Sequence, residues 1–203
     1  MVSGITKPNS PLSPISSSII QSVKSVTHIA CAYFIFDSRD SRNVLQSFDG
    51  MLRSIAYQLT CHFDQMPEAI LSIYKDHGSG TTAPSHDSLR KIISLALGCI
   101  RETAIIIDAA DESVDRDQVL GWLKALTSTP EAHRKAHILV TSRDEIDIRR
   151  HLQAFNTIYV HDHTRPDIES HINSTIASTR LGSFSAETLE KVHGTLLNDA
   201  DGM

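Results

Sequence analysis

Three apolar runs constrain the fold of this chain most, because each has the composition of a strand covered on both faces. They are HIACAYFIF at residues 28–36, TAIII at 103–107 and HILV at 137–140. Strands that are apolar throughout occur almost only in parallel sheets with helices on both faces. Amphipathic segments predict those helices at 44–60, 66–75, 87–100, 117–126, 146–152, 167–178 and 186–197, with a shorter helix starting near residue 16. The sequence therefore predicts an α/β fold with a mainly parallel sheet flanked by helices.

Polar residues follow each apolar run at the point where the predicted strand ends. Asp37 follows the first run, and the triplet 141–143 (Thr-Ser-Arg) follows the third. The second run leads into the motif IIIDAADE, in which Asp108 ends the strand. Ligands of open α/β sheets bind at the carboxyl ends of the strands. We therefore expect the functional site at this edge of the sheet.

The acidic motif at 105–112 has the chemistry of a magnesium site. A carboxylate at the end of a buried strand, such as Asp108, can hold the hydration shell of a Mg²⁺ ion that bridges nucleotide phosphates. Glu112, with Asp111 beside it, can polarise a water for attack on the terminal phosphate. The simpler interpretation is a strand followed by a solvated acidic turn. Arg143 likewise suits either a bidentate phosphate contact or a surface ion pair with the acidic residues that follow it.

The motif IIIDAADE together with ILVTSR, preceded by AYFIFDSRD and LRSIAYQL, resembles the NACHT-type STAND NTPases of the fungal nephrocystin-like N-terminal group. The resemblance implies a three-layer P-loop NTPase-like core. It makes IIIDAADE the Walker B motif, with Asp108 as metal and cofactor ligand and Glu112 and Asp111 as catalytic residues. It makes ILVTSR the sensor strand, with Thr141 and Arg143 as cofactor-binding residues. The implied activity is nucleoside-triphosphate hydrolysis with magnesium and ATP or GTP.

The phosphate-binding loop of that family is damaged here. The pattern GxxxxGK[ST] is expected between a first strand and the helix near residue 16, but the chain reads TKPNSPLSP at 6–14. Leu12 stands where lysine is expected, and only Ser13 matches the hydroxyl ligand. Proline has no N–H and a fixed φ, so Pro8, Pro11 and Pro14 remove donors from the anion-binding loop. The first strand is truncated to a few residues as well, and its loss exposes the edges of neighbouring strands.

We therefore expect a fragment of a NACHT-like domain that cannot hydrolyse nucleotide and acts as an interaction or regulatory module. Two other interpretations stay open: a truncated or misread gene product, and weak nucleotide binding through the magnesium site alone. The fully functional alternative is an ATP- or GTP-binding STAND NTPase that uses Asp108 and Glu112 with magnesium. The expected segments are a Ser/Pro-rich remnant at 1–18, the α/β core at 19–180 and the start of a helical segment at 181–203.

Composition limits the partners and the compartment. The 203 residues carry a formal net charge of -5, which argues against nucleic acid as a partner. No apolar run approaches the length that spans a bilayer, and no signal peptide is evident. The three cysteines form no CxxC pair, and we expect Cys31 and Cys99 to be buried free thiols. Protein partners and a cytoplasmic location follow as expectations, with no cofactor certain.

A histidine cluster near the C-terminal part of the chain is a weaker candidate for a metal site. His161, Asp162 and His163 follow a predicted short strand at 157–160, and His171 comes eight residues after His163. No cysteine or pair of carboxylates completes a tetrahedral set of ligands. We expect these side chains to be polar loop residues.

Overall fold

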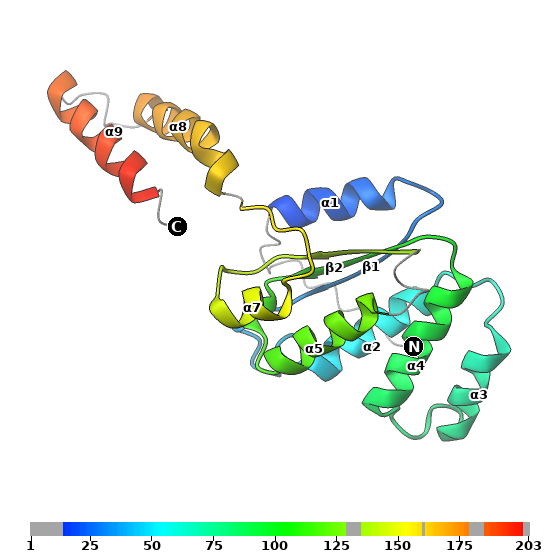
Figure 1. The fold of residues 1–203 in the computed structure, drawn as a ribbon. Coiled ribbons are helices and arrows are strands. Elements are labelled where there is room, and N and C mark those ends of the chain that lie inside the picture. The colour runs from blue at the N-terminus through cyan, green and yellow to red at the C-terminus, as the bar shows by residue number, and fades with distance from the viewer. Residues whose placement is uncertain (1–13, 129–134, 160, 179–184, 201–203) are drawn as a thin grey trace. The chain divides into compact units, whose positions relative to one another are not determined.

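The computed structural model describes residues 14–128, 135–159, 161–178 and 185–200 (Figure 1). The chain divides into two compact units, Met1–Gln153 and Ala154–Met203. The first unit contains the sheet and the acidic motif at its carboxyl end.

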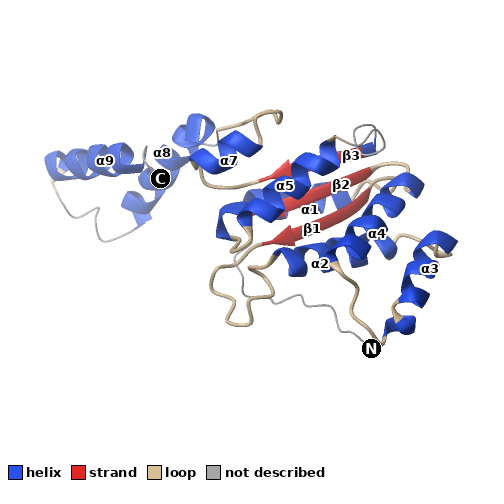
Figure 2. Ribbon diagram, turned by 60° about the horizontal axis from the view of Figure 1, so that its bottom comes forward, coloured by secondary structure: helices blue, strands red, loops and turns tan. Residues whose placement is uncertain are grey.

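A three-stranded, all-parallel sheet forms the centre of the first unit. Its strands are β1 (Ala30–Ile35), β2 (Thr103–Asp108) and β3 (Ala136–Val140), and they lie side by side in that order (Figure 2). The register pairs Ala30 with Thr103 and Thr103 with Ala136, so the strands start nearly level. The predicted α/β fold with a parallel sheet flanked by helices is confirmed.

Helices cover the two faces of the sheet unequally (Figure 1). One face carries α1 (Pro14–Lys24), which buries Ile20 against Cys31 and Ile106. The other face carries the larger core, which includes Phe34, Ile55 and buried residues of several helices. The other helices that the structure describes in this unit are α2 (Phe48–Thr60), α3 (Glu68–Asp76), α4 (His86–Cys99), α5 (Arg116–Thr127) and α7 (Ile146–His151), with short 3-10 turns at η1 (Gly78–Gly80) and η2 (Ala110–Glu112).

Side-chain caps set the start of the two helices that pack most closely on the larger face. The Ser47 hydroxyl accepts a hydrogen bond from Gly50 N at the start of α2, and Asp115 Oδ2 accepts one from Phe48 N. The Ser85 hydroxyl does the same for Ser88 N in α4. Such caps satisfy amides that have no partner inside the helix. They place the start of α2 four residues later than the apolar periodicity predicts, because residues 44–47 belong to the preceding loop.

Several predictions from the sequence are wrong in detail. Strand β3 is only half-buried, although it is as apolar as β2, because it lies at an edge of the described sheet. Residues 157–159 form no strand, and helix α8 begins at His161, so the histidines predicted to lie in a loop start a helix. Cys31 is buried, and burial raises the pKa of its thiol, but Cys99 is exposed because it ends α4 at the surface.

In the second unit the structure describes two helices, α8 (His161–Ser178) and α9 (Ala186–Ala200), and Ile172 is a buried residue of α8. The side chains of 161–165 lie outside the described residues, so the structure does not test the metal site considered for His161, Asp162 and His163. Among the helices that the structure describes, none has both the length and the apolar character needed to cross a bilayer.

Candidate functional site

Asp108 is buried at the carboxyl end of β2, and two hydroxyl groups donate to one oxygen of its carboxylate. Ser16 Oγ lies 2.6 Å from Asp108 Oδ1, and Thr141 Oγ1 lies 2.5 Å from the same atom. Ser16 is fully buried, and Asp108 is 3% exposed. The carboxylate therefore connects α1, β2 and the segment after β3 at one point.

The turn after Asp108 is held against the same segment through its backbone. Ala109 has φ 55° and ψ 49°, a left-handed conformation that is uncommon for a residue with a Cβ. Its N–H donates to Thr141 Oγ1 at 3.0 Å, and Ala110 N donates to Thr141 O at 2.9 Å. These two bonds offset the cost of the left-handed residue, which is about 1 kcal/mol. The turn directs the chain into η2, which carries the other two acidic residues of the motif.

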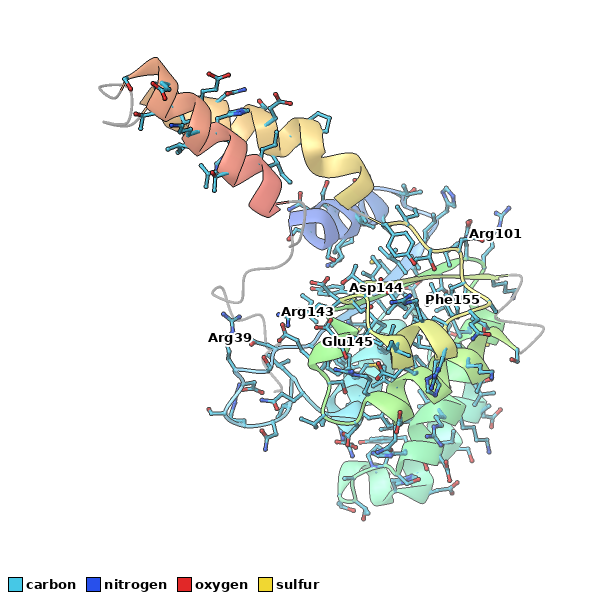
Figure 3. The ribbon with its side chains drawn as sticks, turned by 60° about the vertical axis from the view of Figure 1, so that its left-hand side comes forward. Arg39, Arg101, Arg143, Asp144, Glu145 and Phe155 are labelled. Atoms are coloured by element: carbon cyan, nitrogen blue, oxygen red, sulfur yellow. The ribbon has the colours of Figure 1, made fainter. Side chains whose placement is uncertain are left out.

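The carboxylates of η2 reach the segments that follow the two outer strands. Glu112 Oε2 accepts a hydrogen bond of 2.7 Å from Ser38 N, after β1. Asp111 Oδ1 accepts one of 3.0 Å from Arg143 N, after β3, and its Oδ2 lies 3.5 Å from Arg143 Nε. Asp111 is nearly buried, with its side chain 8% exposed, whereas that of Arg143 is 81% exposed. The labelled residues Arg143 and Glu145 lie near one another on the segment after β3 (Figure 3).

Arg116, at the start of α5, fixes the position of this acidic turn. Its Nη2 donates to the carbonyl oxygen of Asp111, while its Nη1 contacts Glu145 and Asp147, the latter at 3.0 Å. The hydrogen bond to Asp147, with Glu145 nearby, raises the pKa of the Arg116 guanidinium above its ordinary value. The same hydrogen bond lowers the pKa of the Asp147 carboxyl. Arg116 therefore ties the segment that leads into α7 to the backbone of the motif.

The loop after β1 is organised by its own carboxylates. Asp37 accepts hydrogen bonds from the backbone N–H and the guanidinium of Arg39, and the side-chain bond raises the pKa of that guanidinium. Asp40 accepts from Leu45 N at 2.9 Å, and this bond holds the pKa of its carboxyl below the ordinary value. Figure 3 shows Arg39 on this loop, at the surface. These contacts shape the loop whose Ser38 amide meets Glu112.

The structure brings five of the six predicted site residues into one network: Asp108, Asp111, Glu112, Thr141 and Arg143. The sixth, Ser13, lies outside the described residues. Arg143 pairs with Asp111, whereas Asp144 pairs with Arg149 and Glu145 with Arg116. The surface ion pair proposed for Arg143 from its sequence neighbours is therefore replaced by a contact within the motif.

Two residues of this network were not predicted as part of the site. Ser16 lies four residues before the buried Ile20, so helical spacing places both on the side of α1 that faces the sheet. That spacing could have singled out Ser16 among the serines of residues 16–18. Arg116 gave no such signal, because its partners come from residues 111, 145 and 147.

The oxygen atoms of Asp108 and of the two hydroxyls bonded to it are the kind of metal ligand that a hard cation prefers. One carboxylate and two hydroxyls offer the oxygen ligands that Mg²⁺ prefers, and Asp108, Ser16 and Thr141 would hold it. Magnesium normally takes one or two protein carboxylates and completes its shell with waters and phosphates. Nowhere in the described part of the chain do three or more His, Cys, Asp or Glu side chains gather as a metal site.

A polar cavity of about 590 Å³ lies beside the acidic motif, at the start of α5. It is lined by Ser113, Val114, Asp115, Arg116, Asp117, Gln118 and Asp147, and so does not include Asp108 or Thr141. Three of the lining side chains are carboxylates, and the one cation among them, Arg116, is already paired with Glu145 and Asp147, so the lining repels phosphate groups. This cavity is therefore unsuited to the phosphates of a nucleotide.

Comparison with known protein families identifies a match that covers most of the first unit. The family model described as "Nephrocystin 3, N-terminal" matches residues 7–143, which include Asp108 and the residues bonded to its carboxylate. A search of curated proteins found no match.

Proposed function

The chain belongs to the nephrocystin 3 N-terminal family, and from this premise we propose that its α/β unit is a P-loop-type domain that does not hydrolyse nucleotide. In this proposal the unit acts as an interaction or regulatory module of the NACHT-like type. The acidic motif keeps its place at the end of β2, but its carboxylates serve to hold the sheet together.

The observation that supports this role is that each carboxylate of the motif accepts a hydrogen bond from a segment outside the motif. Asp108 is bonded to hydroxyls of α1 and of the segment after β3, Glu112 to the Ser38 amide and Asp111 to the Arg143 amide. A carboxylate that accepts such bonds fixes its neighbours, and losing Asp108, whose bond to Ser16 is buried, leaves a buried donor unsatisfied. The prolines at 8, 11 and 14 support the same conclusion, because they remove amide donors from the loop where phosphates would bind.

A second candidate function, Mg-nucleotide binding, is favoured by the oxygen ligands around Asp108. Here Asp108, Ser16 and Thr141 would hold the ion, whose chemistry would be to neutralise phosphate charge. Glu112 would have to release Ser38 N before it could orient a water. The two candidates make opposite predictions for two substitutions of Asp108.

The substitutions Asp108→Ala and Asp108→Asn separate a structural role from a magnesium role. Alanine removes the acceptor of two hydroxyl groups, and we expect the free energy of unfolding to fall by about 3 kcal/mol. Asparagine keeps an acceptor oxygen in the same place, so we expect a loss of only about 1 kcal/mol. Urea unfolding of the full chain measures both losses in unfolding free energy.

The same two variants are compared with the wild type for Mg-ATP and Mg-GTP turnover. We expect the wild type to show no more phosphate release than either variant, and its melting temperature to be unchanged by millimolar nucleotide. A bound ligand must stabilise the native state, so a clear upward shift would support the second candidate. Turnover in the wild type that disappears in both variants would overturn the proposed non-hydrolysing role.

A further inference from the structure

The cavity beside the acidic motif lies between the start of α5 and α7, two helices that pack side by side (Figure 1). Its volume of about 590 Å³ falls within the range of about 300–1,000 Å³ that ligand sites usually have. Six consecutive residues, 113–118, line it where the chain enters α5, and Asp147 lines it from α7. All seven belong to the described part of the chain. The charge of the lining therefore follows from described residues alone.

Acidic side chains dominate this lining. Asp115, Asp117 and Asp147 contribute carboxylates, and Arg116 is the only cation among the seven described residues that line the cavity. The Arg116 guanidinium already contacts Glu145 and Asp147 through Nη1. Two carboxylates thus balance this one charge, and Asp115 and Asp117 leave the lining with a net negative charge. Such a lining attracts a cationic group.

Two of the carboxylates are held in place by the fold itself. Asp115 Oδ2 accepts a hydrogen bond of 2.9 Å from Phe48 N, and the Asp115 amide donates to Ser113 Oγ at 3.2 Å. Asp147 Oδ2 lies 3.0 Å from Arg116 Nη1, and this bond lowers the pKa of the Asp147 carboxyl. Asp147 is therefore ionised at neutral pH. Groups that are already fixed lose little conformational freedom when a ligand binds, which favours binding.

Exposed apolar side chains beside the carboxylates distinguish between the kinds of cation. Val114, which lines the cavity, is 65% exposed, and so is Ile146, which precedes Asp147 in α7. No other large apolar side chain in the described part of the first unit is as exposed. A bare metal ion gains nothing from such neighbours, and the described residues gather no three metal-ligating side chains here. Lysine and arginine combine an apolar stem with a charged end, which matches carboxylates beside apolar groups.

We propose that this cavity binds an arginine or lysine side chain from a basic peptide segment of a partner protein. The charged end of that side chain pairs with Asp115 and Asp117, and its apolar stem lies on Val114. The net charge of -5 on the whole chain favours the approach of a basic segment. The inference rests on the proposed interaction role, for which it names the chemistry of the partner.

Fluorescence anisotropy of a labelled peptide tests this binding to the full chain. The probe is a short peptide of alternating arginine and alanine, and its control carries glutamate in place of arginine. We expect saturable binding of the arginine peptide, weakened by added salt, and no binding of the glutamate peptide. Equal binding of the two peptides, or no binding of the arginine peptide, would overturn the proposal.

A matched pair of lysine variants tests whether the peptide binds at the cavity. Asp117 and Asp87 are each the second residue of a helix, α5 and α4, so lysine at either position changes the net charge and the first helical turn alike. We expect Asp117→Lys to raise the dissociation constant of the arginine peptide about tenfold or more, and Asp87→Lys to change it less than about twofold. Circular dichroism shows whether both variants fold. Equal effects would mean that net charge alone attracts the peptide, and would overturn the cavity as its site.

Light scattering of the wild type and Asp117→Lys distinguishes a partner protein from a second copy of this chain. We expect the mass of both to be independent of protein concentration. A mass that rises with concentration for the wild type alone would assign the cavity to a second copy and overturn the proposed partner. Nucleotide turnover would overturn the non-hydrolysing role without affecting the peptide titration. Conversely, a failed titration leaves the role of the motif's carboxylates in the sheet standing.

Discussion

The two edges of the parallel sheet differ in how their outward backbone groups are satisfied. On β1, the amide of Gln58 bonds to both backbone groups of Tyr33. On β3, Thr141 N donates to Ile107 O, so the backbone groups of Ile138 and Val140 point away from β2. No side chain among the described residues is seen to bond to them as Gln58 bonds to Tyr33. Natural sheets generally protect their edges against unwanted pairing. Among the described residues, a side chain thus closes the β1 edge, and no side chain closes the β3 edge in the same way.

Proline substitutions in β3 give the largest expected effect. The N–H of Leu139 lies on the side of β2, so Leu139→Pro removes a ladder bond and should lower the free energy of unfolding by about 3 kcal/mol. Val140→Pro removes an outward N–H instead, and edge strands tolerate proline in that position. We expect it to cost about 1 kcal/mol. Urea unfolding of both variants measures the difference, and equal losses would show that the outer edge is paired in the monomer.

Gln58→Ala should turn the closed edge into an open one. It leaves the N–H and C=O of Tyr33 without the side-chain amide, at an expected cost of about 2 kcal/mol in unfolding free energy. The control is Gln21→Ala, an exposed position on α1 that should change stability by less than about 0.5 kcal/mol. Light scattering should detect stronger self-association of the Gln58 variant than of the wild type. If β1 stays non-associating without Gln58, the amide does not protect that edge.

The pH dependence of stability gives the smallest expected effect, through the helix that carries Gln58. The Arg53 guanidinium, assisted by His86, lowers the pKa of Asp49 at the start of α2. A lowered carboxyl pKa contributes stability above the unfolded-state value of about 3.9, and this contribution is lost as the pH falls through the folded-state pKa. Because the Asp49 side chain is 42% exposed, we expect less than about 1 kcal/mol.

The test for Asp49 compares unfolding free energies of the wild type and Asp49→Asn between neutral and acidic pH. The wild type should be slightly more stable near neutral pH, and the two curves should converge below pH of about 4. A constant difference across the whole range would mean that the Asp49 charge does not contribute to holding α2.

The sequence predicts the strands and the acidic motif well, because both depend on local patterns. Asp108 ends an apolar run, and a residue in that position of a parallel sheet lies at the ligand-binding edge whatever its neighbours are. The contrast between the edges could not be predicted in the same way. Gln58 meets Tyr33 across 25 positions of sequence, and no periodicity of α2 identifies that partner. The exposure of β3 depends on what lies beside it, which its own apolar residues do not determine.

Ser16 and Arg116 illustrate the same limit within the site. Each meets its partners only after the strands and helices have packed, and the contact of Ser16 with Asp108 spans 92 positions of sequence. The left-handed conformation of Ala109 has no signal either, because alanine does not favour it. Five of the predicted residues lie together in one network, and the groups that position them were found only from the structure.

The contacts of the acidic turn are all at one end of the sheet, and this asymmetry has a consequence for how the strands open. At the carboxyl ends, Glu112, Asp108 and Asp111 connect the turn to the segments after β1 and β3. At the opposite end, the Thr103 hydroxyl is buried without a partner in the described structure. The contacts of Glu102 with His28 and His137 also join segments at this end, but their side chains are partly exposed. We therefore expect the backbone amides at the amino ends of the strands to exchange faster than those beside the acidic turn.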